Sequence, residues 1–199
     1  MAATDLPLTR ERIVAAAEDV IRRFGPAKAT VVDVARALGV SHAAVYRHVA
    51  TKAELRDLVV ERWAEATMPP LRAIASAAGP APQRLRALFD GLIAVKRRRA
   101  SDDPELFAAY RSLAADAQSV ASQHVDEIVS LAARIVRDGI ADGSFRGDLH
   151  ADATARALLW ATSRFHHPAH AEAWGDASLD AVYDDVWGLA MRGMVAAGG

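Results

Sequence analysis

The sequence of 199 residues contains no cysteine. A disulfide framework, a zinc site built from thiolates and a cysteine nucleophile are therefore excluded, and the composition fits a reducing compartment. Aromatic residues are also scarce, at 6%, whereas apolar residues of all kinds make up 52%. The core must be built largely from Ala, Leu, Val and Ile, a composition that favours helices.

Long apolar segments are missing as well. No window of the chain has the ~18 charge-free apolar residues that a membrane span requires. Residues 1–25 also lack the uninterrupted apolar stretch of a signal peptide. We therefore expect a cytoplasmic protein with no membrane partner.

Catalytic motifs are absent from the sequence. It has no Gly-x-Ser-x-Gly elbow, phosphate-binding glycine loop, dinucleotide fingerprint or His-Glu-x-x-His pair. The three histidines between His166 and His170 could suggest a metal site. However, Pro168 breaks the helical face between His166 and His170, and no acidic residue lies at a suitable spacing. We expect no enzymatic activity, no cofactor and no metal.

Apolar residues recur at helical spacing along the whole chain, without an alternating strand pattern or an internal repeat. The pattern predicts an all-α fold of about nine helices. Four are expected at residues 9–24, 30–38, 41–49 and 51–69, and five more at 81–100, 104–117, 118–143, 151–165 and 178–195. Pro69 and Pro70 either end the fourth helix or kink it.

Two domains are expected, because the prolines at 69 and 70 follow a compact group of four short helices. We predict a small unit at residues 1–62 and a larger helical one at 63–199. The first holds ten Lys/Arg and eight Asp/Glu, and the second fourteen and seventeen. The small basic excess of the first unit gives weak support for a DNA surface.

Residues 30–49 read as a helix-turn-helix, with Gly39 in the turn. Ser41 is expected to cap the second of these helices, and Thr51 with Glu54 forms a capping box for the next. The outer face of the second helix then carries His42, Ala43, Tyr46 and Arg47, which can donate to phosphates or base edges. Helix spacing alone fits equally well a plain helical corner with solvated side chains.

The stretch "TVVDVARALGVSHAAVYRHVATKAELRDLVV", behind "TRERIVAAAEDVIRRFG", closely resembles the N-terminal DNA-binding domain of the TetR family of bacterial transcriptional regulators, over residues 9–62. The resemblance implies that Tyr46, His48 and Lys52 contact phosphates and that Thr30 caps its helix near the DNA backbone. It also places four residues at the variable positions that face base edges: His42, Ala43, Ala44 and Arg47. Val31 and Val32 replace a residue that is often polar in the family, which leaves a base contact from that helix open.

The last predicted helix carries a wide apolar stripe, and such a stripe at the surface of a single chain indicates an interface with a partner. The stripe comprises Leu179, Val182, Tyr183, Val186, Trp187, Ala190 and Met194. Together with Ala153, Ala157 and Trp160 on the preceding helix, it is predicted to form a four-helix interface in a homodimer. The alternative is that the stripe only closes the core of one chain, and the family resemblance favours the dimer.

Family members bind a small molecule inside the larger domain, so the resemblance implies an effector that the sequence does not identify. The candidate lining residues are Phe89, Leu92, Phe107, Tyr110, His124 and Trp160, although aromatic residues at helical spacing also fit a plain core. We expect a repressor that binds a palindromic double-stranded DNA operator as a dimer and is released by its ligand. The alternatives are a helical small-molecule-binding or scaffolding protein without DNA binding, and a small helical enzyme.

Overall fold

The computed structural model describes residues 7–196, and every regular element in that part of the chain is a helix, as predicted. It contains eleven α-helices and one 3-10 helix, and the chain divides into two compact units. The first unit comprises residues up to Ala64 together with Asp103–Ala121, and the second comprises Glu65–Asp102 and the residues from Ser122 onward. Within the described range, no helix is both long and apolar enough to cross a membrane.

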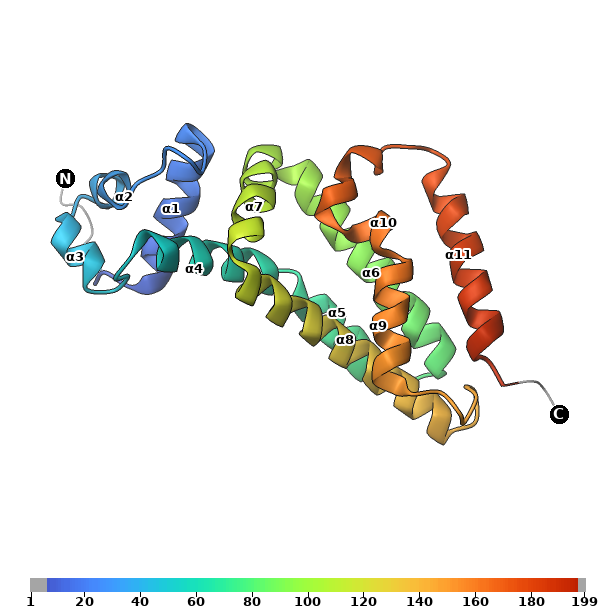
Figure 1. The fold of residues 1–199 in the computed structure, drawn as a ribbon. Helices are drawn as coiled ribbons and strands as arrows, with labels where there is room; N and C mark the ends of the chain where they lie inside the picture. The colour runs from blue at the N-terminus through green and yellow to red at the C-terminus, as the bar shows by residue number, and fades with distance from the viewer. Residues whose placement is uncertain (1–6, 197–199) are drawn as a thin grey trace. The chain divides into compact units, whose positions relative to one another are not determined.

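The first unit contains five helices (Figure 1). They are α1 (Arg10–Phe24), α2 (Val31–Leu38), α3 (His42–Tyr46), α4 (Lys52–Glu65) and α7 (Pro104–Asp116). Its core is formed largely by aliphatic residues such as Ile13, Val45 and Val60, which are fully buried. The aromatic part of this core is a cluster of Trp63 from α4 with Phe107 and Tyr110 from α7.

Side-chain caps begin the helices of this unit. The predicted caps Thr30 and Ser41, and also Thr9, each accept a hydrogen bond from the backbone N–H three residues later, at 3.2–3.3 Å. Gly39 ends α2 with a φ of 67°, which is a left-handed conformation that glycine adopts without a steric penalty. Thr51 caps α4 by accepting from the N–H of Glu54 at 3.0 Å. The side-chain oxygens of this sequence therefore fix where each short helix begins.

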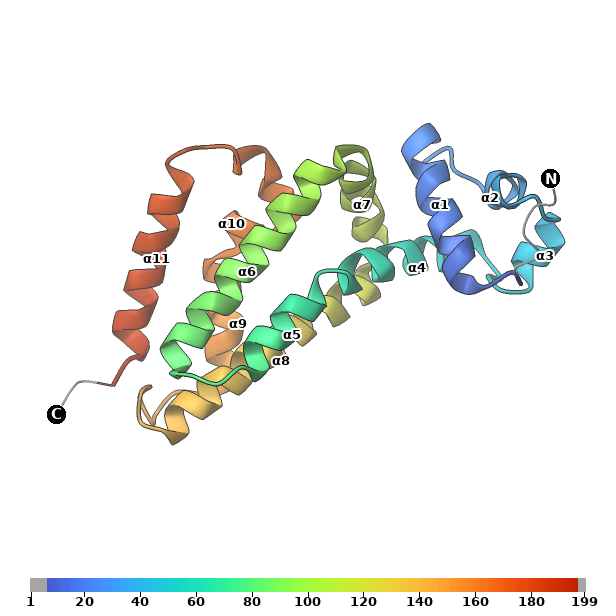
Figure 2. The same ribbon diagram turned by 180° about the vertical axis from the view of Figure 1, so that it is seen from behind.

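The second unit contains the other helices (Figure 2). They are α5 (Met68–Ser76), α6 (Ala81–Asp102), α8 (Gln118–Ala141), which starts in the first unit, α9 (Ala151–Ala161), α10 (Ser163–His166), the 3-10 helix η1 (Pro168–Ala173) and α11 (Leu179–Met194). Helix α5, helix α10 and η1 are the segments beyond the nine that the sequence predicts. Pro69 and Pro70 lie in the first turn of α5, where a missing N–H costs nothing, so they start a helix.

The core of the second unit is a continuous cluster of buried residues from α5, α6, α8, α9 and α11. Gly139 of α8 lies against Phe145, whose ring is almost fully buried and leaves no room for a β-carbon at the glycine. The N–H of Phe145 donates to the carbonyl of Gly139 at 2.8 Å, which ends α8. Phe145 also forms an isolated backbone bridge with Val195, so the chain after α11 is tied to the end of α8.

Segment 103–121 joins the first unit although it lies far along the chain. Trp63 stacks on Tyr110, and Arg22 of α1 pairs with Asp103 at 2.8 Å, both within this unit. The end of the first stretch, at Ala64, lies close to the predicted division after residue 62. The functional division into residues 1–62 and 63–199 stays a prediction, and the addition of α7 is not expected from the sequence.

Candidate functional site

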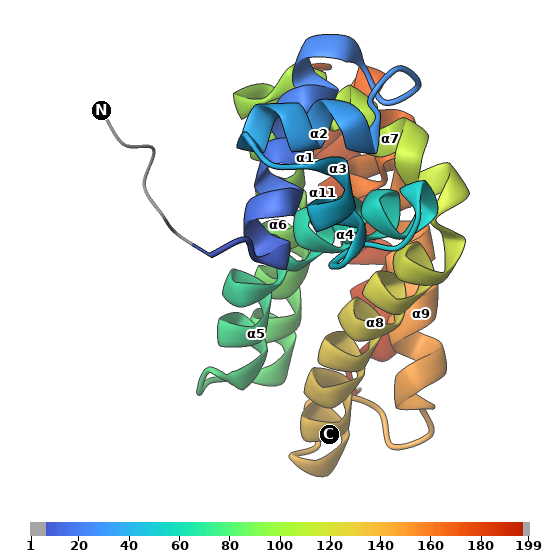
Figure 3. The same cartoon turned by 90° about the vertical axis from the view of Figure 1, so that its left-hand side faces the viewer.

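Helices α2 and α3 form a helix-turn-helix, and Figure 3 shows them beside α1 and α4. Val34 and Ala35 of α2 and Val45 of α3 are buried on the inner side of the pair. Across the turn, the N–H of Val40 donates to the carbonyl of Ala35 at 3.0 Å. The opposite side of α3 therefore faces solvent.

The residues predicted to contact DNA gather at this surface. Tyr46 is 45% exposed. His42, Ala43, Arg47, His48, Lys52 and Thr30 are exposed too, and Ala44 is half-buried. Helix α3 ends at Tyr46, so Arg47 and His48 follow it in a turn whose next N–H groups, of His48 and Val49, both donate to the carbonyl of Val45. A hydroxyl, a guanidinium, an imidazole and an ammonium are thus available within seven residues, and each can donate to a phosphate or a base edge.

Arg10 of α1 contacts the backbone of the segment that carries this surface. Its Nε donates to the carbonyl of His48 at 3.2 Å, and its guanidinium pairs with Glu54. Glu54 in turn accepts from the N–H of Ala50 at 2.7 Å. Arg10 and Glu54 therefore position the segment that carries Arg47 and His48. The sequence identifies Glu54 as a capping residue, but the contact of Arg10 joins residues 38 positions apart and has no local signal.

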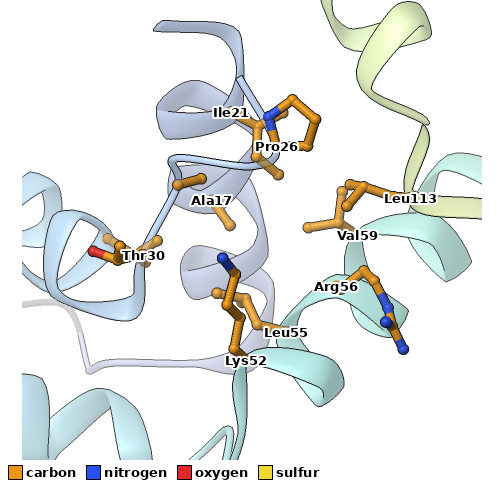
Figure 4. A pocket seen from close by; sticks show the side chains of 11 residues that line it. Ala17, Ile21, Pro26, Thr30, Lys52, Leu55, Arg56, Val59 and Leu113 are labelled. Carbon is orange, nitrogen blue, oxygen red and sulfur yellow. The ribbon is translucent and has the colours of Figure 1, made fainter. Parts of the chain in front are cut away.

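Lys52 and Thr30 flank a small recess in the first unit (Figure 4). The recess holds about 30 Å³, enough for one water-sized group, and is too small for an effector. Its other lining residues are mostly apolar: Ala17, Ile21, Pro26, Ala29, Val34, Leu55, Arg56, Val59 and Leu113. The amine of Lys52 donates to the carbonyl of Ala27 at 3.4 Å, in the loop before Thr30. Two predicted phosphate contacts, from α4 and from the start of α2, therefore lie on one side of this unit.

A second polar group lies inside the second unit. The Nζ of Lys96 on α6 lies 3.2 Å from the Nε2 of His124 on α8. His166 of α10 places its Nε2 3.3 Å from both the hydroxyl of Thr162 and the carbonyl of Leu159. Lys96 is only 4% exposed, and both histidines and Thr162 are buried. We call Lys96, His124 and His166 the interior cluster.

Burial controls the protonation of the interior cluster. Desolvation, together with the charge of Arg99, lowers the pKa of Lys96 to about 8, so the amine is mainly protonated at neutral pH. Desolvation and the charge of Lys96 lower the pKa of His124 and of His166 to about 3 each. Both imidazoles are therefore neutral at neutral pH. The interior cluster carries one positive charge inside an apolar domain.

Two family descriptions match the sequence. Residues 13–59 match the bacterial regulatory proteins of the tetR family, and residues 81–187, more than half of the chain, match the tetracyclin repressor-like C-terminal domain. The chain belongs to the TetR family. It is a transcription regulator with an N-terminal helix-turn-helix domain and a C-terminal ligand-binding domain, which confirms the resemblance seen in the sequence.

Solved structures of other regulators share the fold of this TetR family member. The regulator FadR of Bacillus subtilis, solved with stearoyl-CoA, has a TM-score of 0.68 at 14% identity over 93% of this chain and 99% of its own. The fatty acid degradation regulator FadR of Bacillus halodurans has a TM-score of 0.67 at 15% identity over 94% and 97%. SmeT, the repressor of the Stenotrophomonas maltophilia multidrug efflux pump SmeDEF, has 0.67 at 20% over 96% and 92%. No curated protein matches the sequence.

The predicted effector residues of this TetR regulator belong to both units of the chain. Phe89 and Leu92 are in the core of the second unit, where the ring of Phe89 lies 5.5 Å from that of Trp187. Phe107 and Tyr110 belong to the first unit and pack on Trp63. Trp160 is 55% exposed. Of the six candidates, His124 is the one that lies in the interior cluster.

Lys96 and His166 are not among the interior residues predicted for the regulator. Lys96 falls on the same buried face of α6 as Phe89 and Leu92. A lysine at a core position of a predicted helix is therefore the sequence feature that could have revealed it. The sequence suggests His166 only as a metal ligand. It is buried, whereas His167 and His170 are exposed, and the described residues contain no group of three side chains suited to a metal ion.

The residues predicted to form the dimer interface divide into two sets. Leu179, Tyr183, Trp187 and Met194 are buried in the core of their own unit, so this part of the stripe closes the monomer. Val182 is 43% exposed, and Val186 and Ala190 are partly buried. On α9, Ala153, Ala157 and Trp160 are all exposed on one face, since they are spaced by four and three residues.

Proposed function

We propose that this TetR family regulator is a repressor that binds a palindromic operator as a homodimer and leaves it when an effector fills the second unit. The observation that carries the proposal is the exposed group of Tyr46, Arg47, His48 and Lys52, which lies at the end of the helix-turn-helix and at the start of α4. All four side chains reach the surface of the first unit. Their chemistry suits DNA, where most contacts go to phosphates and a few donors read base edges.

Tyr46, His48 and Lys52 are assigned to phosphates, with Thr30 at the cap of α2. Arg47 and the start of α3, with His42, Ala43 and Ala44, are assigned to base edges. Small residues at the start of α3 allow its backbone to enter the ~12 Å wide major groove. Arg10 supports the assignment, because its contact with the carbonyl of His48 orders the segment that carries Arg47 and His48 in the protein without DNA.

A homodimer is supported by the apolar surface that the second unit leaves uncovered. Trp160 on α9 and Val182 and Leu189 on α11 are large apolar side chains that are 55%, 43% and 67% exposed. Two copies that place these helices against each other across a two-fold axis would bury them in a four-helix interface. The dimer presents two helix-turn-helix units, which requires an operator with two inverted half-sites.

The effector is proposed to be an apolar or amphipathic small molecule. The core of the second unit is aliphatic and aromatic, so a cavity that opened within it would be lined by apolar side chains. The structural neighbours solved with stearoyl-CoA or named as regulators of fatty acid degradation or of drug efflux are consistent with such chemistry. Release follows if the effector binds more tightly to the state that does not hold DNA, and coupling of this kind is typically ~1–3 kcal/mol.

The proposal is tested by selecting an operator from random duplexes with the purified protein and measuring its affinity by fluorescence anisotropy. We expect the selected sequences to contain two inverted copies of one half-site, with a stoichiometry of two chains per duplex. An effector that raises the melting temperature should weaken operator binding as well, because linkage is reciprocal. Absence of duplex affinity at low salt would favour instead a helical ligand-binding or scaffolding protein.

A further inference from the structure

We propose that the interior cluster of Lys96, His124 and His166 receives the anionic group of the effector, so that the effector is an amphipathic oxyanion: an apolar body with a carboxylate or a phosphate. This inference rests on the proposed function, since it assumes that an effector enters the second unit. It adds the chemical class of the ligand and the side chains that select it.

The geometry of the cluster provides the first argument. Lys96 of α6 lies 3.2 Å from His124 of α8, 28 residues further along the chain. Helix α10, which carries His166, packs against α6, and the charge of Lys96 lowers the pKa of both imidazoles. Thr162 adds a buried hydroxyl beside His166. In the described part of this unit, the buried side chains that can gain or lose charge near neutral pH are Lys96, His124 and His166, all of basic type. Such a set matches an anion.

The position of Lys96 provides the second argument. The residue follows the core spacing of α6 after Phe89 and Leu92, and a lysine is seldom found at so buried a position. Burial of an ammonium group in an apolar interior destabilises the fold. A costly charge at a core position of a ligand-binding domain is typical of a functional site, where stability is given up for recognition.

The hydrogen bonds within the cluster show how it can respond to an anion. The carbonyl of Leu159 can only accept, so the Nε2 of His166 carries the proton that bonds to it. The Nε2 of His124 accepts from the ammonium of Lys96, which places the proton of that neutral ring on Nδ1. An entering anion favours the protonated forms of all three side chains, because opposite charge stabilises them. Binding of an anion therefore stabilises the charged form of Lys96 and raises the pKa of both imidazoles.

The test compares three probes that share one ten-carbon chain: decanoate, decyl phosphate and decanol. Isothermal titration at pH 7, below the micelle concentration of each probe, should show that the parent protein binds at least one anion about 10- to 100-fold more tightly than decanol, as expected for charge-assisted hydrogen bonds. The carboxylate and phosphate arms identify which oxyanion is preferred. Equal affinity for decanol and both anions, or no binding of either anion, would contradict the proposal without any variant.

Two variants locate the selectivity. Lys96→Met keeps the length of the side chain and removes the charge, and we expect it to bind the anions within about threefold of decanol while melting at least as high as the parent protein. Arg98→Met is the matched control, because it removes a positive charge from an exposed position of the same helix and should keep the full preference. An anion preference that survives Lys96→Met would overturn the assignment.

Operator release separates this inference from the proposed function. If decanoate or decyl phosphate binds through Lys96 but leaves operator affinity unchanged at saturation, the anion site stands and effector release fails. If decanol releases the operator as well as the anions do, effector release stands and the anion site fails. Lys96→Met should keep the operator affinity of the parent protein and lose its release by the anion.

Discussion

The indole ring of Trp63 in α4 stacks on the phenol ring of Tyr110 in α7, with centroids 3.9 Å apart and planes 19° from parallel. Phe107 adds a second ring 5.8 Å from the indole. All three side chains are buried in the first unit. This aromatic cluster attaches α7 to the unit that carries the helix-turn-helix.

Replacement of Tyr110 should therefore destabilise the first unit. Tyr110→Ala removes a buried ring and leaves a cavity, so we expect a decrease of about 3–5 kcal/mol in the free energy of unfolding. Tyr110→Phe keeps the stacked ring and should cost less than about 1.5 kcal/mol. Urea unfolding followed by circular dichroism measures both, and a decrease below about 1 kcal/mol for Tyr110→Ala would show that the stack does not stabilise the unit in solution.

Gly139 should not tolerate any side chain. A β-carbon there would lie 2.8 Å from the Cε2 atom and closer still to the Cδ2 atom of buried Phe145, and 2.9 Å from the β-carbon of Ala81. We expect Gly139→Ala to lower the free energy of unfolding by about 1–3 kcal/mol through overpacking. Gly193→Ala on α11 is the control, since nothing lies within 4 Å of its β-carbon position. Denaturant midpoints that fall equally for both variants would refute the steric explanation.

The interior cluster makes stability depend on pH. His124 and His166 have a pKa of about 3 in the folded protein, below the value of 6.5 expected after unfolding. The stabilising effect of keeping them neutral is complete above pH 6.5 and is lost as the pH falls toward 3, because the unfolded chain then binds more protons. Each histidine should contribute a slope of up to about 1.4 kcal/mol per pH unit in that window.

Denaturant unfolding at pH 7, 6 and 5 measures this slope, and His124→Gln and His166→Gln should each reduce it. His42→Gln is a matched control at an exposed position of the first unit. A slope that both cluster variants leave unchanged would show that other groups cause the acid sensitivity. Lys96 adds a separate window, because its pKa of about 8 lies below the ordinary value of 10.5, so stability should increase as the pH rises from 8 toward 10.5.

A charge placed among the exposed apolar residues of α9 and α11 should disrupt the proposed dimer. Leu189→Glu and Trp160→Glu place a charge on that surface without entering the core, so we expect folded monomers. Phe24→Glu introduces the same charge at an exposed apolar residue of the first unit and should leave the dimer intact. Sedimentation velocity measures the mass of each variant. Dimers of normal affinity from both α9 and α11 variants would move the interface elsewhere.

Trp187 differs from these exposed residues. The apolar pattern assigns it to the interface, but its ring packs on Phe89 and lies near the guanidinium of Arg86 in the core of its own unit. A charge at Trp187 would therefore unfold the unit, and its effect would say nothing about dimerisation. Periodicity identifies an apolar face but does not show which neighbour covers it, because the same stripe fits an intrachain core and a subunit interface.

Local signals predict the helices best. Thr30 and Ser41 are recognisable as caps because each precedes an apolar helical pattern, and the structure has a cap at both of them. The position of α7 in the first unit depends on Trp63 and Tyr110, which are 47 positions apart in the sequence, so no local pattern reveals it. The same reason explains why spacing alone groups Phe107 and Tyr110 with an effector site.

The polar surface of the helix-turn-helix is predictable from the residues themselves and from the family motif. The interior cluster is not, because Lys96, His124 and His166 come from three helices that only the fold brings together. A lysine among core positions of α6 is nevertheless visible in the sequence. A charged residue at a buried helical position is therefore a reason to search for its partners on other helices.

Binding isotherms at several salt concentrations, on the selected operator and on a scrambled duplex, test whether the helix-turn-helix surface binds DNA as assigned. Lys52→Ala should weaken binding to both duplexes by similar factors, and it should reduce the slope of log K against log salt by roughly 0.9 for every phosphate that a protomer no longer neutralises. Arg47→Ala should cost ~1–3 kcal/mol per half-site on the operator and little on scrambled DNA. Arg98→Ala, at an exposed position of the second unit, should change neither. The assignment is contradicted if Lys52→Ala spares scrambled DNA, or if Lys52→Ala and Arg47→Ala both bind the operator like the parent protein.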